Sequence, residues 1–309
     1  MTMPRTLKTA LAAAFLFLAA GAAQAASPLV DVDWLKGNLT KPNLVVLDIR
    51  NRIGNAGSRE VFAEGHIPGA VYSDYLADGW RVTRDGVPGM LPPVGDLEKL
   101  IGGLGIGNGD HVVLVAGGIN AADMGSATRV YWTFKVLGHD AVSILDGGHA
   151  AWVAAGAPVE KGTAPRPAKT FAADFRPELI ASRADVVAAQ KTGTVLIDNR
   201  PPAQYSGAAK HAKAQRGGTI PGAVNLPQEK ITKDNGGFFA DSGTIGKLLA
   251  AVGIKKDGPA ITFCNTGHWA SLGWFVEHEL RGNEQTRMYD GSMVDYTSDP
   301  ALPVAKGGS

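Results

Sequence analysis

The two halves of this 309-residue chain repeat the same series of short motifs, and no other feature restricts its fold as strongly. Paired motifs keep their order, and the offset between them stays between 144 and 153 residues. The pairs are LDIR (47–50) with IDNR (197–200), GHIPGAV (65–71) with GTIPGAV (218–224), DLEKLIGGLGI (96–106) with TIGKLLAAVGI (244–254), and LDGG (145–148) with YDGS (289–292). Preserved order at a nearly constant offset indicates one domain of roughly 130 residues present twice.

Each copy has the pattern of an α/β domain. The runs NLVVLDIR and GTVLIDNR are apolar up to an aspartate, which predicts buried strands ending at Asp48 and Asp198. Further strands are expected in IPGAV of each copy, in HVVLVA and AITFC, and before positions 145 and 289. Helices are expected at 97–104, 122–137, 245–252 and 269–280. This alternation predicts tandem duplicated α/β domains, each a parallel β-sheet flanked by helices.

The first 25 residues have the composition of a cleaved signal peptide. A short basic start precedes an apolar run (10–20) and an A-x-A cleavage pattern (23–25). The run is too short to span a membrane comfortably, so no stable membrane association is expected after cleavage. We therefore expect a periplasmic protein with a signal peptide at 1–25, a first domain at 26–158, a linker at 159–175 and a second domain at 176–309.

Charge and cysteine content narrow the classes of function. A net charge of +1 provides no strong field for nucleic acid, so no nucleic-acid partner is expected. The single cysteine cannot form an internal disulfide, and an exported thiol is open to oxidation. Retention of an oxidisable thiol therefore favours a functional role for this cysteine. A duplicated chain can supply both halves of an assembly by itself, so a monomer is expected.

This cysteine, Cys264, follows the predicted strand AITF, and ligands of open α/β sheets bind beyond the carboxyl ends of the strands. The 148-residue offset places Ala116 at the equivalent position of the first copy, so only the second copy carries a thiol. The loop from Cys264 to Ala270 leads into a helix, whose first amides lack intrahelical partners. We expect these amides to form an anion cradle that favours a thiolate. Gly267 permits a tight curve, which Asn265 and Thr266 can hold through hydrogen bonds.

These motifs together resemble the two-domain rhodanese family of sulfurtransferases over nearly the whole chain. The resemblance rests on the LDxR and GHIPGA signatures, the cysteine loop, the DGG or DGS motif and the thiol-free first domain. It implies a rhodanese fold for both domains and a catalytic Cys264 that accepts a sulfane sulfur as a persulfide. Thiosulfate or a related small donor would supply the sulfur, and cyanide or a thiol would remove it. No metal or organic cofactor is expected, because one cysteine and scattered histidines lack zinc-ligand spacing.

The loop also departs from that family. Thiosulfate-type members usually carry basic residues where this chain has Asn265 and Thr266, and often an arginine where it has Gln204. Members that use 3-mercaptopyruvate usually have Val-Thr where His268 and Trp269 stand. The donor therefore stays open between these types. The alternative function is a non-catalytic or carrier-type module that binds sulfur or an anion.

Other residues near the predicted site allow two interpretations each. His268 is either a cation, hydrogen-bond donor or proton shuttle for the reaction, or a helix-start histidine bonded to the backbone. Trp269 caps the pocket or, as we expect, belongs to the core with Trp274. Arg81 and Arg84 are surface charges, the more common case, or reach across to an anionic donor.

The aspartate and arginine of the second D-x-R motif, Asp198 and Arg200, are expected to form a supporting pair that braces the loop. A cysteine-loop phosphatase is not expected, because the sixth and seventh residues after Cys264 are Ala270 and Ser271 where an arginine would be needed.

Overall fold

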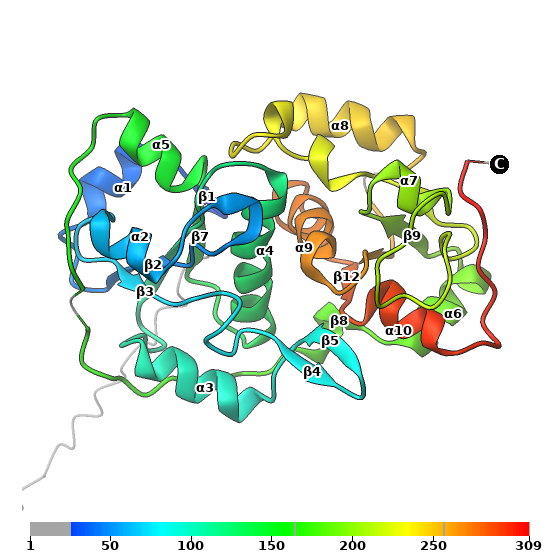
Figure 1. The fold of residues 1–309 in the computed structure, drawn as a ribbon, viewed down its shortest axis with the longest axis horizontal. Helices are drawn as coiled ribbons and strands as arrows, with labels where there is room; N and C mark the ends of the chain where they lie inside the picture. The colour runs from blue at the N-terminus through cyan, green and yellow to red at the C-terminus, as the bar shows by residue number, and fades with distance from the viewer. Residues whose placement is uncertain (1–25, 164, 256, 309) are drawn as a thin grey trace, which may run out of the picture.

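Two α/β units lie side by side in the computed structural model, which describes residues 26–163, 165–255 and 257–308 (Figure 1). Each unit contains a five-stranded sheet, with strand order β1-β7-β6-β2-β3 in the first and β10-β9-β11-β12-β8 in the second. All neighbouring strands within these two sheets are parallel. The predicted fold class is therefore confirmed. The predicted signal peptide lies outside the described residues.

The first domain extends from β1 to α5. Its elements are β1 (Leu29–Val30), α1 (Val32–Asn38), β2 (Leu44–Asp48), η1 (Ile53–Asn55), α2 (Arg59–Glu64), β3 (Val71–Tyr72), β4 (Val82–Arg84), β5 (Val87–Met90), α3 (Val94–Gly103), β6 (His111–Val115), α4 (Ala121–Val136), β7 (Val142–Leu145) and α5 (Gly148–Ala154). Side chains cap several of these helices: Asp31, Ser58 and Asn120 accept hydrogen bonds from first-turn amides of α1, α2 and α4.

The second domain repeats this plan. Its elements are η2 (Pro177–Leu179), β8 (Ile180–Ala181), α6 (Arg183–Thr192), β9 (Val195–Asp198), α7 (Pro202–Tyr205), β10 (Val224–Asn225), η3 (Gln228–Lys230), η4 (Lys233–Asn235), α8 (Ser242–Ala251), β11 (Ala260–Phe263), α9 (His268–Trp274), η5 (Phe275–Leu280), β12 (Thr286–Tyr289) and α10 (Ser292–Ser298). The helix expected at 269–280 is thus an α-helix that continues as the π-helix η5.

Strand register places the two loops of interest at equivalent points. In the first sheet Asp48 of β2 pairs with Val115 of β6, and Ala116 follows. In the second sheet Asp198 of β9 pairs with Phe263 of β11, and Cys264 follows. The equivalence of Ala116 and Cys264, predicted from the sequence offset, is therefore confirmed by the hydrogen-bonded register.

Helix α4 lies at the centre of the molecule, where it packs against α9 of the second domain (Figure 1). Fifteen of its sixteen residues are buried, including the polar Asp123, Thr128 and Arg129. A surface helix would show an apolar stripe and a polar face. Burial on every side follows because one side of α4 covers its own sheet and the other faces the second domain.

A pair of reciprocal hydrogen bonds joins the domains. The carboxylate of Asp290 accepts the amide of Leu91 at 2.6 Å, and the carboxylate of Asp146 accepts the amide of Phe239 at 2.9 Å. Each aspartate begins its DGG or DGS motif, and Leu91 and Phe239 are 148 residues apart. The two domains therefore meet like the subunits of a twofold-symmetric dimer.

Two further segments connect the halves. The antiparallel hairpin β4–β5 extends from the first domain toward the second (Figure 1). The described residues of the predicted linker, 159–163 and 165–175, lie along the first domain, where Lys169 forms a 2.7 Å ion pair with Asp110. In the part of the chain that the structure describes, no helix combines the length and the apolar character needed to cross a membrane.

Candidate active site

Cys264 is held at the carboxyl end of β11 by bonds to its own backbone. Its carbonyl oxygen accepts the amide of Met293 at 3.0 Å, and its amide donates to the Ser292 hydroxyl at 3.0 Å. The residue is 1% exposed. The strand and the start of α10 thus fix the backbone that carries the thiol.

Ser292 connects the two ends of the predicted cradle. Its Oγ accepts the amides of Cys264 and Gly267, at 3.0 and 3.2 Å, and lies 3.9 Å from the Cys264 Sγ. It reaches them from an unusual backbone conformation, with φ +50°. Ser292 is not among the site residues predicted from the sequence. The signal that could have found it is the serine of DGS where the first copy has a glycine.

The loop carbonyls are bonded to neighbouring elements. The carbonyl oxygen of Asn265 accepts the amide of Val294 at 3.1 Å, and those of Thr266 and Gly267 accept arginine side chains of the first domain. The amides of Asn265, Thr266, His268 and Trp269 have no acceptor among the described residues. Gly267 has φ +75°, and a side chain there would meet Arg129 and Asp290. This arrangement leaves donors for an anion, as the cradle requires.

The equivalent loop of the first domain already holds an anion. The Asp123 carboxylate, seven residues after Ala116, accepts the amides of Gly117, Gly118 and Ile119 at 2.7 to 3.3 Å. Burial raises the pKa of Asp123 to about 6, and these amide bonds oppose that rise. Seven residues after Cys264 stands Ser271, which instead bonds Thr128 at 2.7 Å. The amides of the first-domain loop are therefore occupied by a carboxylate of the same chain, whereas no carboxylate of the described residues occupies the amides of the loop that carries the thiol.

His268 is bonded at both ring nitrogens to the first domain. Nε2 lies 2.8 Å from the carbonyl oxygen of Ala122, and Nδ1 lies 2.8 Å from the hydroxyl of Tyr75. Because a carbonyl only accepts, Nε2 carries the proton and Nδ1 accepts from Tyr75. Burial, with smaller contributions from the charges of Arg81 and Arg129, lowers the pKa of His268 to about 3. Of the two interpretations, the geometry favours a neutral, backbone-bonded histidine.

The remaining aromatic and small residues of the loop support its shape. Trp269 is partly buried against the core, and Ala270 is fully buried. Trp274 is fully buried and its indole donates to the carbonyl oxygen of Thr286 at 3.0 Å. The core position expected for both tryptophans agrees with these surroundings.

The pair Asp198–Arg200 is buried and bidentate. Arg200 donates to the two carboxylate oxygens at 2.9 and 2.6 Å and to the carbonyl oxygen of Gly218 at 2.7 Å. Thr219 donates to the same carboxylate at 2.7 Å. The pair supports the segment around Gly218 and has no direct bond to the cysteine loop. Asp48 and Arg50 form the same pair in the first domain, at 2.9 Å.

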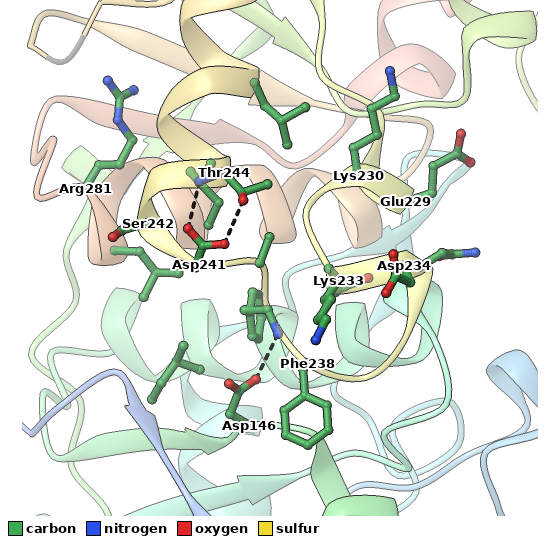
Figure 2. Close-up of a pocket in the computed structure, with 18 residues that line it drawn as sticks. Asp146, Glu229, Lys230, Lys233, Asp234, Phe238, Asp241, Ser242, Thr244 and Arg281 are labelled. Carbon is green, nitrogen blue, oxygen red and sulfur yellow. Dashed lines mark hydrogen bonds between the residues drawn. The ribbon is translucent and has the colours of Figure 1, made fainter.

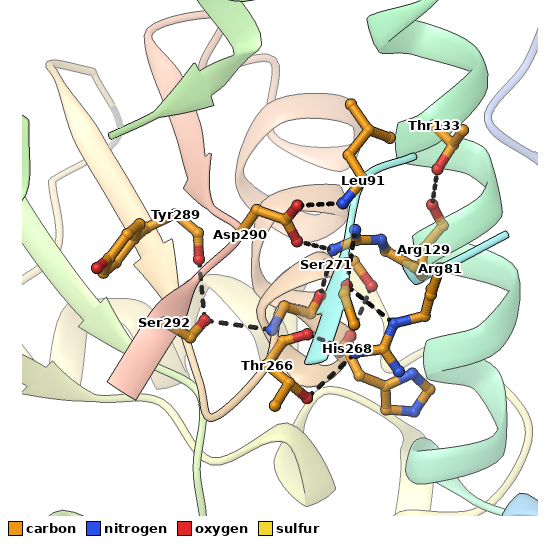
Figure 3. A network of polar contacts seen from close by, with 12 residues as sticks. Arg81, Leu91, Arg129, Thr133, Thr266, His268, Ser271, Tyr289, Asp290 and Ser292 are labelled. Atoms are coloured by element: carbon orange, nitrogen blue, oxygen red, sulfur yellow. Dashed lines mark hydrogen bonds and ion pairs between the residues drawn. The ribbon is translucent and has the colours of Figure 1, made fainter. Parts of the chain in front are cut away.

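Two arginines of the first domain donate hydrogen bonds to the cysteine loop (Figure 3). Arg129 of α4 donates to the carbonyl oxygen of Gly267 at 3.2 Å and forms a 2.5 Å ion pair with Asp290. Arg81, just before β4, donates to the carbonyl oxygen and hydroxyl of Thr266 at 2.5 and 3.1 Å. Arg84 lies exposed on the hairpin. Of Arg81 and Arg84, the two arginines named from the sequence, only Arg81 therefore reaches the loop. Arg129 was not predicted, because nothing in the sequence around it indicates contact with Gly267 or Asp290.

A family model described as the rhodanese-like domain matches residues 31–155 and 182–299. The chain belongs to the rhodanese family. A putative thiosulfate sulfurtransferase of Mycobacterium leprae (strain TN) is 33% identical over 285 residues, which cover 90% of this chain and 98% of the relative. The sulfur carrier protein TtuD of Thermus thermophilus is 30% identical over 291 residues, covering 90% of this chain and 96% of that relative.

The structure is also similar to a solved structure with the rhodanese fold. The 3-mercaptopyruvate sulfotransferase SseA of Escherichia coli superposes with a TM-score of 0.73 at 26% identity, covering 86% of this chain and 99% of that one. The matches confirm the predicted tandem rhodanese organisation. The predicted sulfurtransferase class agrees with the names of these relatives. The exact domain boundaries stay a prediction.

Two of the departures from the usual rhodanese pattern, Asn265 and Gln204, contact each other. Nδ2 of Asn265 donates to Oε1 of Gln204, on α7, at 2.8 Å. Both side chains are uncharged, so they place a neutral amide pair next to this rhodanese's thiol, where basic residues were expected from the resemblance. In the described part of the chain, no group of three or more His, Cys, Asp or Glu side chains is placed to hold a metal ion.

A large pocket of about 1160 Å³ lies elsewhere on the domain boundary (Figure 2). It is lined by Asp146 of the first domain and by Phe238, Asp241 and Lys233 of the second, among others. Cys264 and its loop do not line it. The pocket surrounds the Asp146–Phe239 hydrogen bond, which is the counterpart of the Asp290–Leu91 bond beside Gly267 of the cysteine loop.

Proposed function

We propose that this protein is a sulfurtransferase that moves a sulfane sulfur from thiosulfate or a related donor to a thiophilic acceptor through a Cys264 persulfide. The observation that carries the proposal is the contrast between the two equivalent loops. The Ala116 loop has no thiol and its amides bind Asp123, whereas the Cys264 loop has a thiol and unpaired amides. The second loop therefore has both a nucleophile and amide donors that no described protein group occupies.

The reaction has two balanced steps. The Cys264 thiolate attacks the outer sulfur of thiosulfate, the S–S bond of the donor breaks, and sulfite leaves with the electron pair. The terminal sulfur of the persulfide carries a negative charge, which the loop amides stabilise. Cyanide or a thiolate then attacks this outer sulfur, and Cys264 leaves again as the thiolate. The steps need no external oxidant or reductant.

Mass spectrometry of the purified protein tests this function. Incubation with thiosulfate should add about 32 Da, one sulfur atom, to the peptide that carries Cys264. Cyanide should then remove that mass and release thiocyanate. Cys264→Ser is the matched variant, since the smaller hydroxyl keeps the backbone bonds to Ser292 and Met293. No adduct with thiosulfate, mercaptopyruvate or polysulfide would contradict the proposal.

A carrier role is the second candidate, supported by the similarity to the sulfur carrier protein TtuD. A carrier would accept sulfur at Cys264 from another protein's persulfide and would turn over slowly with small donors. A donor panel separates the two roles. Fast multiple turnover with a small donor supports the enzyme, whereas single loading from a persulfidated protein supports the carrier.

We further propose that the protein is exported to the periplasm, with residues 1–25 removed, and acts there as a monomer without membrane association. The basic start, apolar run and A-x-A pattern support export. The reciprocal bonds between the domains support a monomer, because each domain already has its partner within the chain. N-terminal sequencing of protein from the periplasmic fraction and light scattering test these points.

A further inference from the structure

The hairpin β4–β5 brings one arginine of the thiol-free domain to the cysteine loop of the other. We propose that Arg81 binds the anionic sulfur donor and sets the preference for its charge. This inference rests on the proposed sulfur transfer and assigns a substrate-binding residue to it. The first domain then contributes directly to donor recognition.

The position of Arg81 is fixed by several contacts. Its Nη2 donates to both oxygens of Thr266, two residues from Cys264, and its Nε donates to the carbonyl oxygen of Gly89 at 3.1 Å. The guanidinium carbon lies 5.7 Å from the ring centroid of Tyr75. Gly89 has φ +82°, and a side chain there would overlap the guanidinium. The hairpin therefore leaves a space that the arginine fills.

The charge of Arg81 is not balanced by a carboxylate. Among the described residues it forms no ion pair, and its Nη1 has no hydrogen-bond acceptor. Arg129, the other arginine on the loop, is paired with Asp290 at 2.5 Å. His268 is neutral, and Asn265 and Gln204 carry no charge. Arg81 is thus the cation of this loop whose charge remains available.

This charge should matter most for a doubly charged donor. Arg81 is partly buried, so its attraction to an anion is screened less than that of an exposed side chain. Attraction scales with the charge of the donor, so removal of the guanidinium should weaken the reaction of a dianion more than that of a monoanion. A purely structural role, holding the loop through Thr266, would weaken both equally.

Two donors that react alike but differ by one charge test this difference. Thiosulfate is a dianion, and benzenethiosulfonate is a monoanion whose outer sulfur is attacked in the same way with benzenesulfinate as the leaving group. For Arg81→Met we expect kcat/KM to fall about tenfold or more with thiosulfate and about threefold or less with benzenethiosulfonate. Arg81→Lys should recover part of the thiosulfate rate, since it keeps the charge without the planar fork.

Two variants of the same hairpin serve as controls. Arg84→Met removes an exposed charge nearby and should change neither rate more than about twofold. Gly89→Ala keeps Arg81 but displaces its guanidinium, so it should reproduce the selective loss with thiosulfate. Equal losses with the two donors, or no loss in Arg81→Met, would overturn the proposal. Failure of the wild-type protein to form a persulfide with either donor would instead contradict the proposed function itself.

Discussion

Ser292 and Gly148 occupy the same position in the two domains, and both have a positive φ, +50° and +56°. Glycine adopts this conformation easily, whereas a serine is strained by it. The serine also makes bonds that glycine cannot make: its hydroxyl accepts the amides of Cys264 and Gly267. The strain at Ser292 therefore accompanies a function, which is to fix the two ends of the loop that carries the thiol.

Ser292→Ala should destabilise the protein and slow persulfide formation. The alanine keeps the strained backbone and leaves two buried amides without an acceptor, which should lower the free energy of unfolding by about 1–3 kcal/mol. Ser292→Gly loses the same bonds but relieves the strain, so it should be more stable than the alanine variant. Urea unfolding measures the stabilities, and wild-type stability in the alanine variant would show that the hydroxyl has no structural role.

His268 should make stability depend on pH. Its pKa is lowered from 6.5 to about 3 in the folded protein, so between these values the unfolded state binds more protons. The stabilisation is complete above pH 6.5 and is lost as the pH falls toward 3, at about 1.4 kcal/mol per pH unit. Asp123 acts in the opposite direction, because its pKa is raised from 3.8 to about 6.

Comparison of the wild type with His268→Gln isolates the histidine from Asp123. The variant should show a smaller loss of unfolding free energy between pH 7 and pH 4, measured by denaturant titration. The groups that face the imidazole are Tyr75, Arg81 and Arg129. If His268 were a proton shuttle, the substitution would instead remove an ionisation near neutral pH from the profile of kcat/KM.

At the scale of elements, helix α4 forms a large part of the interface between the domains. Its Arg129 is fully buried, bonded to Gly267 and Gly89, and paired with Asp290. Such a pair need not stabilise more than apolar residues of the same shape, but removing one member leaves the other charge buried alone. Loss of either Arg129 or Asp290 alone is therefore expected to destabilise the protein.

Arg129→Met should cost about 3–5 kcal/mol of unfolding free energy, because the buried Asp290 carboxylate is left without its cationic partner. The double variant Arg129→Met with Asp290→Asn removes the uncompensated charge and should recover part of that loss. A double-mutant cycle measured by urea unfolding gives the coupling between the two positions. Additive losses in the cycle would contradict a direct energetic link across the domain boundary.

The elements differ in how well the sequence predicts them. The strands that end at Asp48, Asp198 and Phe263 are predictable, because buried parallel strands require uninterrupted apolar runs. The edge strands β1 and β8 have two residues each, which is too short for any periodicity. The hairpin β4–β5 had a usable signal in Asp85-Gly86, a dipeptide typical of two-residue hairpin turns, and both residues have positive φ.

The site is predictable only in part for a related reason. Cys264 and its loop follow from one chain segment, and Ala116 follows from the 148-residue offset between the two copies. Arg81, Arg129 and Tyr75 contact loop residues that are 138 to 193 positions away in the sequence, and such contacts depend on how the domains pack. The pairing of Asn265 with Gln204 likewise joins two departures that lie 61 residues apart in the sequence.

At the scale of the whole molecule, the two domains share one core. The largest hydrophobic cluster contains Ile101 and Trp132 of the first domain together with Leu249 and Trp274 of the second. Isolating either domain would expose the buried faces of α4 and α9. Neither domain is therefore expected to be stable by itself.

Unfolding of the intact protein should accordingly be a single cooperative transition. Fluorescence of the buried tryptophans and far-ultraviolet circular dichroism should give the same urea midpoint, because both domains lose their shared core together. A fragment that ends within the linker, 26–175, should aggregate or lack a cooperative transition. Two separate midpoints in the intact protein would show that the domains fold independently.

The hairpin that brings Arg81 to the Cys264 loop has a consequence for how the protein behaves on dilution. In a dimer that shares a site between subunits, the site comes apart when the concentration falls below the dissociation constant. Here the linker keeps the two halves at an effective concentration on the order of millimolar, whatever the number of molecules in solution. Specific activity should therefore stay constant down to trace amounts of protein. This would be an advantage after the proposed export, because the site would not depend on the concentration of the protein in its new compartment.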